Sequence, residues 1–270
     1  MEMIPRGAAG DANYRSRDAA NRDHQLTVVR AEANASVLAS TERSATSVAR
    51  ELPDGIGYID LDRANKATLD SALQKFNATR ALILDARGMG RGSANQTATL
   101  AAFVQRVSTQ LSAVVGKQTV RLASAPCFSV APMQSSCAQE RRQFDDVISV
   151  ESLSRYKGRT VLLIDERTQG AFEQFGLALE SVAGTTFIGS PSAGASGALT
   201  AVSLPGQLTA TFSGSEIRHA DGRQLQRVGL TPQVDVRPTV KGIRAGTDEV
   251  LDRAQLWLKE LLDPPARKRK

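Results

Sequence analysis

The stretch from Ala81 to Gly92, ALILDARGMGRG, decides the fold class. Its first four residues form a continuous apolar run, which is typical of a strand buried on both faces of a parallel sheet. Three glycines follow within the five residues from Gly88 to Gly92, and Ser93 and Gln96 then have the spacing of a helix capping box. We therefore expect a buried strand that passes through a glycine-rich loop into the start of a helix.

The flanking segments repeat this pattern. A strand-like run at Gly57–Leu61 and an amphipathic helix precede the loop, which completes a β-α-β unit. A second buried strand at Thr160–Asp165 leads through residues 166–170 into another helix, and a closing helix begins at Thr247 as N-cap and ends before Pro264. The helix before the glycine-rich loop is expected to have an apolar face of Leu69, Ala72, Leu73 and Phe76. The helix after residues 166–170 should have one of Phe172, Phe175, Leu179 and Val182, and the closing helix one of Val250, Leu251, Ala254, Leu258 and Leu261.

Composition excludes several classes of function. The 270 residues are 41% hydrophobic, which is normal for a globular protein. The net charge of +6 comes mostly from the four basic residues that end the chain, and no basic stripe is interleaved with aromatics, so we expect no nucleic-acid partner. No apolar run has the length of a signal or membrane-spanning segment. Cys127 and Cys137 lack metal-ligand spacing, so we expect no metal, and both a small-loop disulfide and two free thiols remain open.

The remaining segments are less regular. Residues 112–158 contain two prolines and both cysteines, and we interpret them as an irregular excursion. A strand at Thr186–Ile188 enters a flexible turn from Gly189 to Gly197, and Pro205-Gly206 and Asp221-Gly222 are typical of hairpin turns. Residues 1–50 are a polar leader with one β-like run, Gln25–Val29. We expect the leader at 1–50, a folded domain at 51–262 and a basic tail at 263–270.

The order of these segments resembles the tail-specific serine peptidases, the C-terminal processing and tricorn-like family. The matching stretches are GIGYIDL, ALILDARGMGRG, GRTVLLIDERTQGAFEQFGLALE, FIGSPSAGASG, LPGQLTATFSG and ADGRQLQRVGLTPQVDV, between Gly55 and Val236. The resemblance implies an α/β spiral domain of the ClpP/crotonase type, built from repeated β-β-α units, that hydrolyses extended peptides or protein C-termini without a cofactor. Relatives are often periplasmic or secreted, and many carry an upstream PDZ domain, so we interpret the leader as the remnant of one.

The resemblance also assigns a site. It places the nucleophilic serine at Gly170 and the lysine base of the processing-protease branch at Ala195, so both side chains are missing here. The tricorn-like branch uses a histidine base supported by serine and glutamate instead, and this chain offers only His24 and His219, neither in a matching motif. The family's glutamate is retained as Glu173, whose i, i+3 spacing puts it on the same side of the helix as Gly170. Both a catalytic part for Glu173 and a purely structural one, as a carboxylate that stabilises the helix dipole, remain open. Backbone N–H groups that bind an oxyanion or substrate are expected in the glycine-rich loop and at the helix start, at Gly88, Gly90, Gly92 and Ala171.

Other residues have structural interpretations. His219 lies beside a predicted hairpin turn and His24 in the polar leader, so neither is expected to be a base. We expect Asp85 and Arg87 to form an ion pair that shapes the glycine-rich loop, and Gln233 stands where the family usually has aspartate. The turn serines Ser190, Ser192 and Ser196 are explained by local hydrogen bonds, although one of them could replace the missing nucleophile.

Three functions remain open. The first is a peptidase-family domain that is impaired or inactive in hydrolysis, because glycine has no hydroxyl. The second is a non-catalytic adaptor that binds peptides by strand addition. The third is a crotonase-like acyl-CoA enzyme, which ranks last because no stretch indicates an adenine-nucleotide site.

Overall fold

The computed structural model describes residues 10–18, 20–30, 47–88, 93–108, 112–122, 140–149, 156–197, 199–206, 208–213 and 215–264. The chain forms two compact units, Met1–Ser47 and Val48–Lys270. In the first unit, β1 (Gly10–Arg17) and β2 (Asp23–Arg30) pair antiparallel. The β-like run predicted at Gln25–Val29 lies inside β2, and β1 was not predicted.

A six-stranded sheet forms the centre of the second unit. The strand order is β13-β9-β8-β5-β4-β3, with all neighbours parallel except the edge pair β3 and β4. Every residue of β4 and β5 is buried, as are residues 160–164 of β8, because helices cover both faces of the sheet. The bounds are β3 Ala49–Leu52, β4 Ile56–Asp60, β5 Ala81–Asp85, β8 Arg159–Ile164, β9 Thr186–Gly189 and β13 Val234–Asp235.

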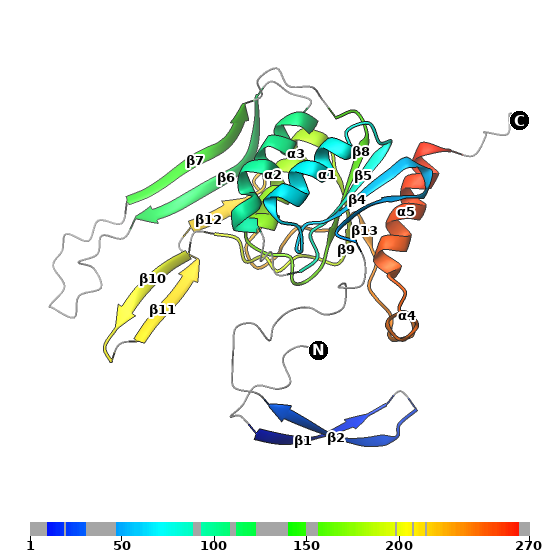
Figure 1. Cartoon of the computed structure of the whole chain (residues 1–270). Helices are drawn as coiled ribbons and strands as arrows, with labels where there is room; N and C mark the ends of the chain where they lie inside the picture. Colours follow the sequence, from blue (N-terminus) through cyan, green and yellow to red (C-terminus); the bar gives the residue numbers. More distant parts are fainter. Residues whose placement is uncertain are drawn as a thin grey trace, which may run out of the picture. The chain divides into compact units, whose positions relative to one another are not determined.

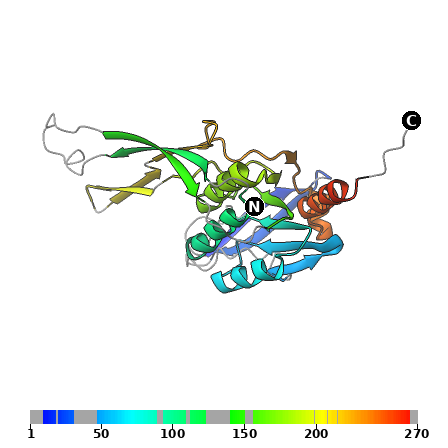
Figure 2. The same ribbon diagram turned by 90° about the horizontal axis from the view of Figure 1, so that it is seen from above.

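The helices separate the core into two layers. Figure 1 shows α1 (Lys66–Lys75), α2 (Ser93–Val107) and α3 (Ala171–Ala183) on one face of the sheet and α5 (Glu249–Leu262) on the other, and Figure 2 shows the same division from above. Side chains alternate accordingly: Leu82 and Leu84 pack in the cluster with α1 to α3, whereas Ile83 packs in the cluster with α5. The short helix α4 (Val240–Ala245) precedes α5. The α/β fold predicted from the buried strands is confirmed.

The interpretation of residues 112–158 as an irregular excursion is wrong, because part of this segment forms strands. Residues 112–158 contain two long antiparallel strands, β6 (Ser112–Leu122) and β7 (Glu140–Ser149), with a register shift between Val114 and Gly116. Together with β12 (Ser215–Arg218) they form a three-stranded sheet of order β12-β6-β7. Further along the chain, β10 (Leu199–Leu204) and β11 (Leu208–Ser213) form a hairpin around the predicted Pro205-Gly206 turn.

Two details of the closing helix differ from prediction. The N-cap of α5 is Asp248 rather than Thr247, since the Asp248 carboxylate accepts the N–H of Leu251 at 3.1 Å. Leu261 is 41% exposed, whereas the other four residues of the predicted apolar face are buried. Cys127, Cys137 and the basic residues at 267–270 lie outside the described residues.

Candidate functional site

Gly170 occupies a sharp turn between β8 and α3. It is the N-cap of α3, and its backbone has φ 60° and ψ −118°, a conformation that residues with side chains rarely adopt. A Cβ built at this position would have no atom within 4 Å. The position is therefore open in space, as an attacking group at the start of a helix would require, and glycine holds the turn without backbone strain.

Glu173 joins the start of α3 to the turn that follows β9. Its side chain is fully buried, and its Oε2 accepts the N–H of Gly170 at 3.2 Å and that of Ala195 at 3.0 Å. Its Oε1 accepts the Ser192 hydroxyl at 2.5 Å and the Gly194 N–H at 2.7 Å. The structure thus brings Gly170, Glu173 and Ala195 together, with the backbone N–H groups of residues 170 and 195 on the same carboxylate oxygen.

The turn that carries Ala195 is held from several sides. The Ala193 N–H donates to the Thr168 carbonyl at 2.9 Å, and the Arg227 N–H donates to the Gly194 carbonyl at 2.7 Å. Ser192 exchanges two hydrogen bonds with Leu230: its N–H donates to the Leu230 carbonyl at 3.1 Å, and its hydroxyl accepts the Leu230 N–H at 2.7 Å. Position 195 is itself exposed, so a longer side chain could extend from it.

The three turn serines are buried and hydrogen-bonded. The Ser190 hydroxyl donates to Glu166 at 3.0 Å, and the Ser196 hydroxyl donates to the Gly170 carbonyl at 3.3 Å. The Ser192 hydroxyl both donates to Glu173 and accepts from Leu230. The serines are therefore hydrogen-bonded as expected, but these bonds are not local, because their partners lie 19 to 38 residues away along the chain.

The glycine-rich loop starts beside the same junction. The Thr168 hydroxyl donates to the Ala86 carbonyl at 2.8 Å, and the Gly88 N–H donates to the Asp165 carboxylate at 3.3 Å. Gly88 has φ 131°, and a Cβ there would lie 2.7 Å from the Asp62 carboxyl group, so only glycine fits. Gly90 and Gly92 lie outside the described residues.

Of the two expected donors that the structure describes, Gly88 and Ala171, the Ala171 N–H is the one that remains available. As the first residue of α3 it has no carbonyl one turn earlier within the helix, and its N–H has no partner within the part of the chain that the structure describes. This N–H therefore lies at the same end of α3 as the open position at Gly170. The helix dipole favours negative charge at this end.

Arg87 forms the expected ion pair and a second one that the sequence did not indicate. Its guanidinium contacts Asp85 at 2.6 Å and Asp248 at 2.7 Å. Burial opposes a charge on Arg87, but the carboxylates of Asp85 and Asp248 more than offset it and hold the guanidinium pKa well above its ordinary value. An aspartate at position 248 is already explained by its role as N-cap, so the sequence does not indicate that it also contacts Arg87, 161 positions away.

The two histidines lie elsewhere. His219 is in the expected hairpin turn, where its N–H donates to the Arg223 carbonyl at 3.0 Å, and its Nδ1 is 2.6 Å from Glu180. Glu180 is ten residues along α3 from Gly170, about 15 Å at 1.5 Å per residue. His24 is exposed in the first unit, with Nε2 3.0 Å from Asp18.

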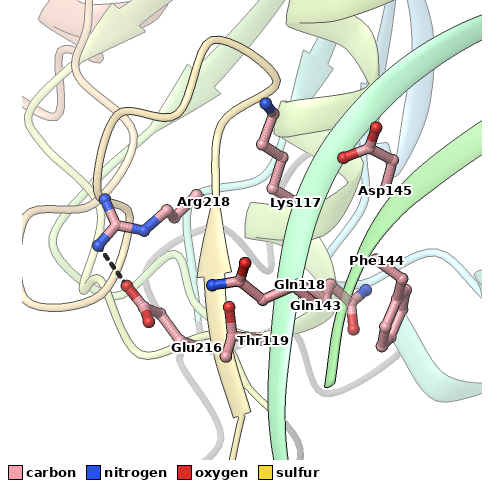
Figure 3. A pocket seen from close by; sticks show the side chains of 8 residues that line it. All are labelled: Lys117, Gln118, Thr119, Gln143, Phe144, Asp145, Glu216 and Arg218. Atoms are coloured by element: carbon pink, nitrogen blue, oxygen red, sulfur yellow. Dashed lines mark ion pairs between the residues drawn. The ribbon is translucent and has the colours of Figure 1, made fainter. Parts of the chain in front are cut away.

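A surface pocket of about 510 Å³ lies on the three-stranded sheet and contains none of these site residues (Figure 3). The Lys117 and Asp145 that line it are register partners on β6 and β7, and Arg218 pairs with Glu216 at 2.5 Å across its other side. Within the described ranges, no cluster of His, Cys, Asp or Glu could hold a metal ion. Among the same residues, no helix is long and apolar enough to cross a membrane.

Comparison with known families identifies the family of the chain. Residues 55–236 match the model of peptidase family S41, and the chain belongs to this family. A search of curated protein sequences finds no match.

Solved structures show the same fold at low sequence identity. A candidate peptidase from Parabacteroides merdae has a TM-score of 0.62 and 17% identity over 78% of this chain. Mature CPAF complexed with lactacystin has a TM-score of 0.68 and 14% identity over 94% of this chain. The chain spans 63% of the length of the first structure and 69% of the second.

Proposed function

We propose that this family S41 domain binds extended peptides or protein C-termini and that it is inactive, or strongly impaired, in hydrolysis. The observation that carries the proposal is the turn at Gly170, which keeps the open position at a helix start but has no side chain to attack a carbonyl. The base position in the same family pattern, Ala195, also lacks a titratable group.

The neighbouring groups do not supply substitutes. The hydroxyls of Ser190, Ser192 and Ser196 are buried in hydrogen bonds, and a nucleophile needs both an open approach and an adjacent base. His219 contacts Glu180 in the later part of α3 rather than the helix start. Without a nucleophile, binding is what this arrangement can still do.

Two features of the helix start support peptide binding. The Ala171 N–H is available at the amino end of α3, where partial positive charge favours a peptide carbonyl or a terminal carboxylate. Glu173 keeps residues 170 and 195 together although neither bears its family side chain. An extended peptide would add backbone hydrogen bonds as a strand beside this site.

Restoring the missing side chains tests whether the site geometry is intact. We expect the unmodified chain to leave an unstructured peptide with a free C-terminus uncleaved, and the double variant Gly170→Ser with Ala195→Lys to cleave it. Ala195→Lys alone is the matched control, because it adds the base without a nucleophile. A double variant that folds but shows no cleavage above this control would contradict the proposed geometry.

Peptide affinity tests the binding role directly. Fluorescence anisotropy with the same labelled peptide should show micromolar binding to the unmodified chain, and amidation of the peptide C-terminus should weaken it if the carboxylate is recognised. Absence of binding to any extended peptide would exclude the adaptor role. The acyl-CoA alternative has no observation in its favour.

A further inference from the structure

The amino end of α5 reaches the buried charge pair next to the glycine-rich loop. The Asp248 carboxylate contacts Arg87 through both oxygens, at 2.8 Å from Nη1 and 2.7 Å from Nη2. Arg87 also contacts Asp85 through Nε at 2.9 Å and Nη2 at 2.6 Å. Its side chain is only 10% exposed, so the guanidinium lies between two carboxylates from distant parts of the chain.

We infer that Asp248 is a positioning residue for the peptide site: it fixes Arg87 and thereby the backbone at Gly88, so that peptide binding depends on α5. This inference rests on the proposed binding function. It extends the site beyond the residues that match the family model, which end at 236.

The geometry supports a mechanical link. A planar guanidinium held by two bidentate carboxylates has little freedom to rotate, and Arg87 is further fixed because its N–H donates to Asp85 at 3.0 Å. The next residue, Gly88, fits tightly between Asp62 and Asp165. A shift of the Arg87 backbone would therefore move Gly88 against one of these carboxylates or break its hydrogen bond.

Helix α5 is well suited to be the fixed end of this link. Its residues Val250, Leu251, Ala254 and Leu258 are buried against the sheet. At its other end, Asp263 pairs with Arg80 at 2.8 Å, but this pair is about half exposed and far along the helix from Asp248. The two ends of one helix thus carry two aspartate–arginine pairs, of which one reaches the glycine-rich loop.

This symmetry supplies a matched experiment with Asp248→Asn and the control Asp263→Asn. Asparagine can still cap α5 by accepting the Leu251 N–H, so the first variant removes the charge on Arg87's partner while keeping the cap. We expect Asp248→Asn to speed hydrogen exchange at Arg87 and Gly88 and to weaken binding of the labelled peptide by about tenfold, or about 1.4 kcal/mol. Asp263→Asn should change both by less than about twofold.

A second variant keeps the test decisive if Asp248→Asn does not fold. Arg87→Lys retains the positive charge but lacks the planar fork, so it should speed exchange at Gly88 as well. Exchange rates at Gly88 that match those of the unmodified chain in every folded variant would overturn the inference. Failure of the unmodified chain to bind peptide would instead count against the proposed function, because the exchange measurement needs no ligand.

Discussion

Two fully buried carboxylates flank the candidate site, and they are stabilised in opposite ways. Asp85, at the end of β5, is paired with the Arg87 guanidinium and accepts the Tyr58 hydroxyl at 2.7 Å. Glu173, in the first turn of α3, is bound by three backbone N–H groups and one hydroxyl, and no cation contacts it among the residues that the structure describes. One carboxylate is balanced by charge and the other by dipoles.

The difference shows what each region does. In the Asp85 region, Arg87 links β5 to α5 through Asp85 and Asp248, and we call these ion pairs the brace. Burial together with the Asp85 charge also raises the pKa of the Tyr58 hydroxyl well above its ordinary value. In the Glu173 region, the carboxylate accepts weaker dipolar hydrogen bonds beside the open backbone position at Gly170, and we call Glu173 and its four donors the hub. Since the donors around Glu173 belong to two separate turns, its carboxylate sets their relative position.

Breaking the brace should have the largest effect on stability. Arg87→Met removes the cation and leaves Asp85 buried without its charge partner, which should lower the free energy of unfolding by about 4 kcal/mol in urea denaturation. Arg80→Met is the matched control, because Arg80 also pairs with an aspartate of the α5 end, but at an exposed position. Equal midpoints for the two variants would show that the brace is not a stabilising contact.

Removing the charge of the hub should have a smaller effect. Glu173→Gln keeps the shape but turns an NH₂ group toward N–H or hydroxyl donors, so we expect a loss of about 2 to 3 kcal/mol in the same measurement. Glu180→Gln on the same helix is the control, because the Glu180 side chain is 24% exposed and can rearrange.

Measurements of peptide affinity should distinguish Glu173→Gln from its control, Glu180→Gln. Glu173→Gln should weaken peptide binding because residues 170 and 195 lose their common acceptor, whereas Glu180→Gln should leave it unchanged. A folded Glu173→Gln variant with full peptide affinity would mean that the carboxylate does not set the relative position of the two turns.

The contrast also explains which features could be predicted from sequence. The β5 and β8 strands were predictable because continuous apolar runs indicate burial on both faces, and Gly170 and Glu173 were placed on one side of a helix by their spacing. The Asp85–Arg87 pair is equally local. These features depend on neighbours within one or two turns of chain.

Long-range features left little signal. Strand β7 was missed because most of its described side chains, those from Gln143 to Val147, are exposed and mainly polar, and of the described ones only Ile148 packs against the core. Its pairing with β6 therefore depends largely on backbone hydrogen bonds. The contacts of Glu173 with Gly194 and of Arg87 with Asp248 join residues 21 and 161 positions apart. Such contacts arise from the folded topology, which periodicity does not encode.

A third carboxylate, Glu180, is intermediate between these two kinds of stabilisation. Substituting it should have the smallest effect on the free energy of unfolding. Burial opposes its ionisation, but hydrogen bonds from His219 and Arg223 outweigh burial and hold the pKa of its carboxyl below the ordinary value of 4.5. A pKa lowered by folding stabilises the native state above the unfolded-state pKa, and this contribution is lost as the pH falls through the folded-state value.

Unfolding in urea at several pH values tests this contribution. We expect Glu180→Gln to be less stable than the unmodified chain by about 1 kcal/mol at pH 7. Because protonation of Glu180 removes the same interactions as the substitution, the difference should shrink as the pH falls below 4.5. A difference that stays constant with pH would show that Glu180 acts through packing alone. His219 would then lie in its hairpin without an electrostatic contribution from this carboxylate.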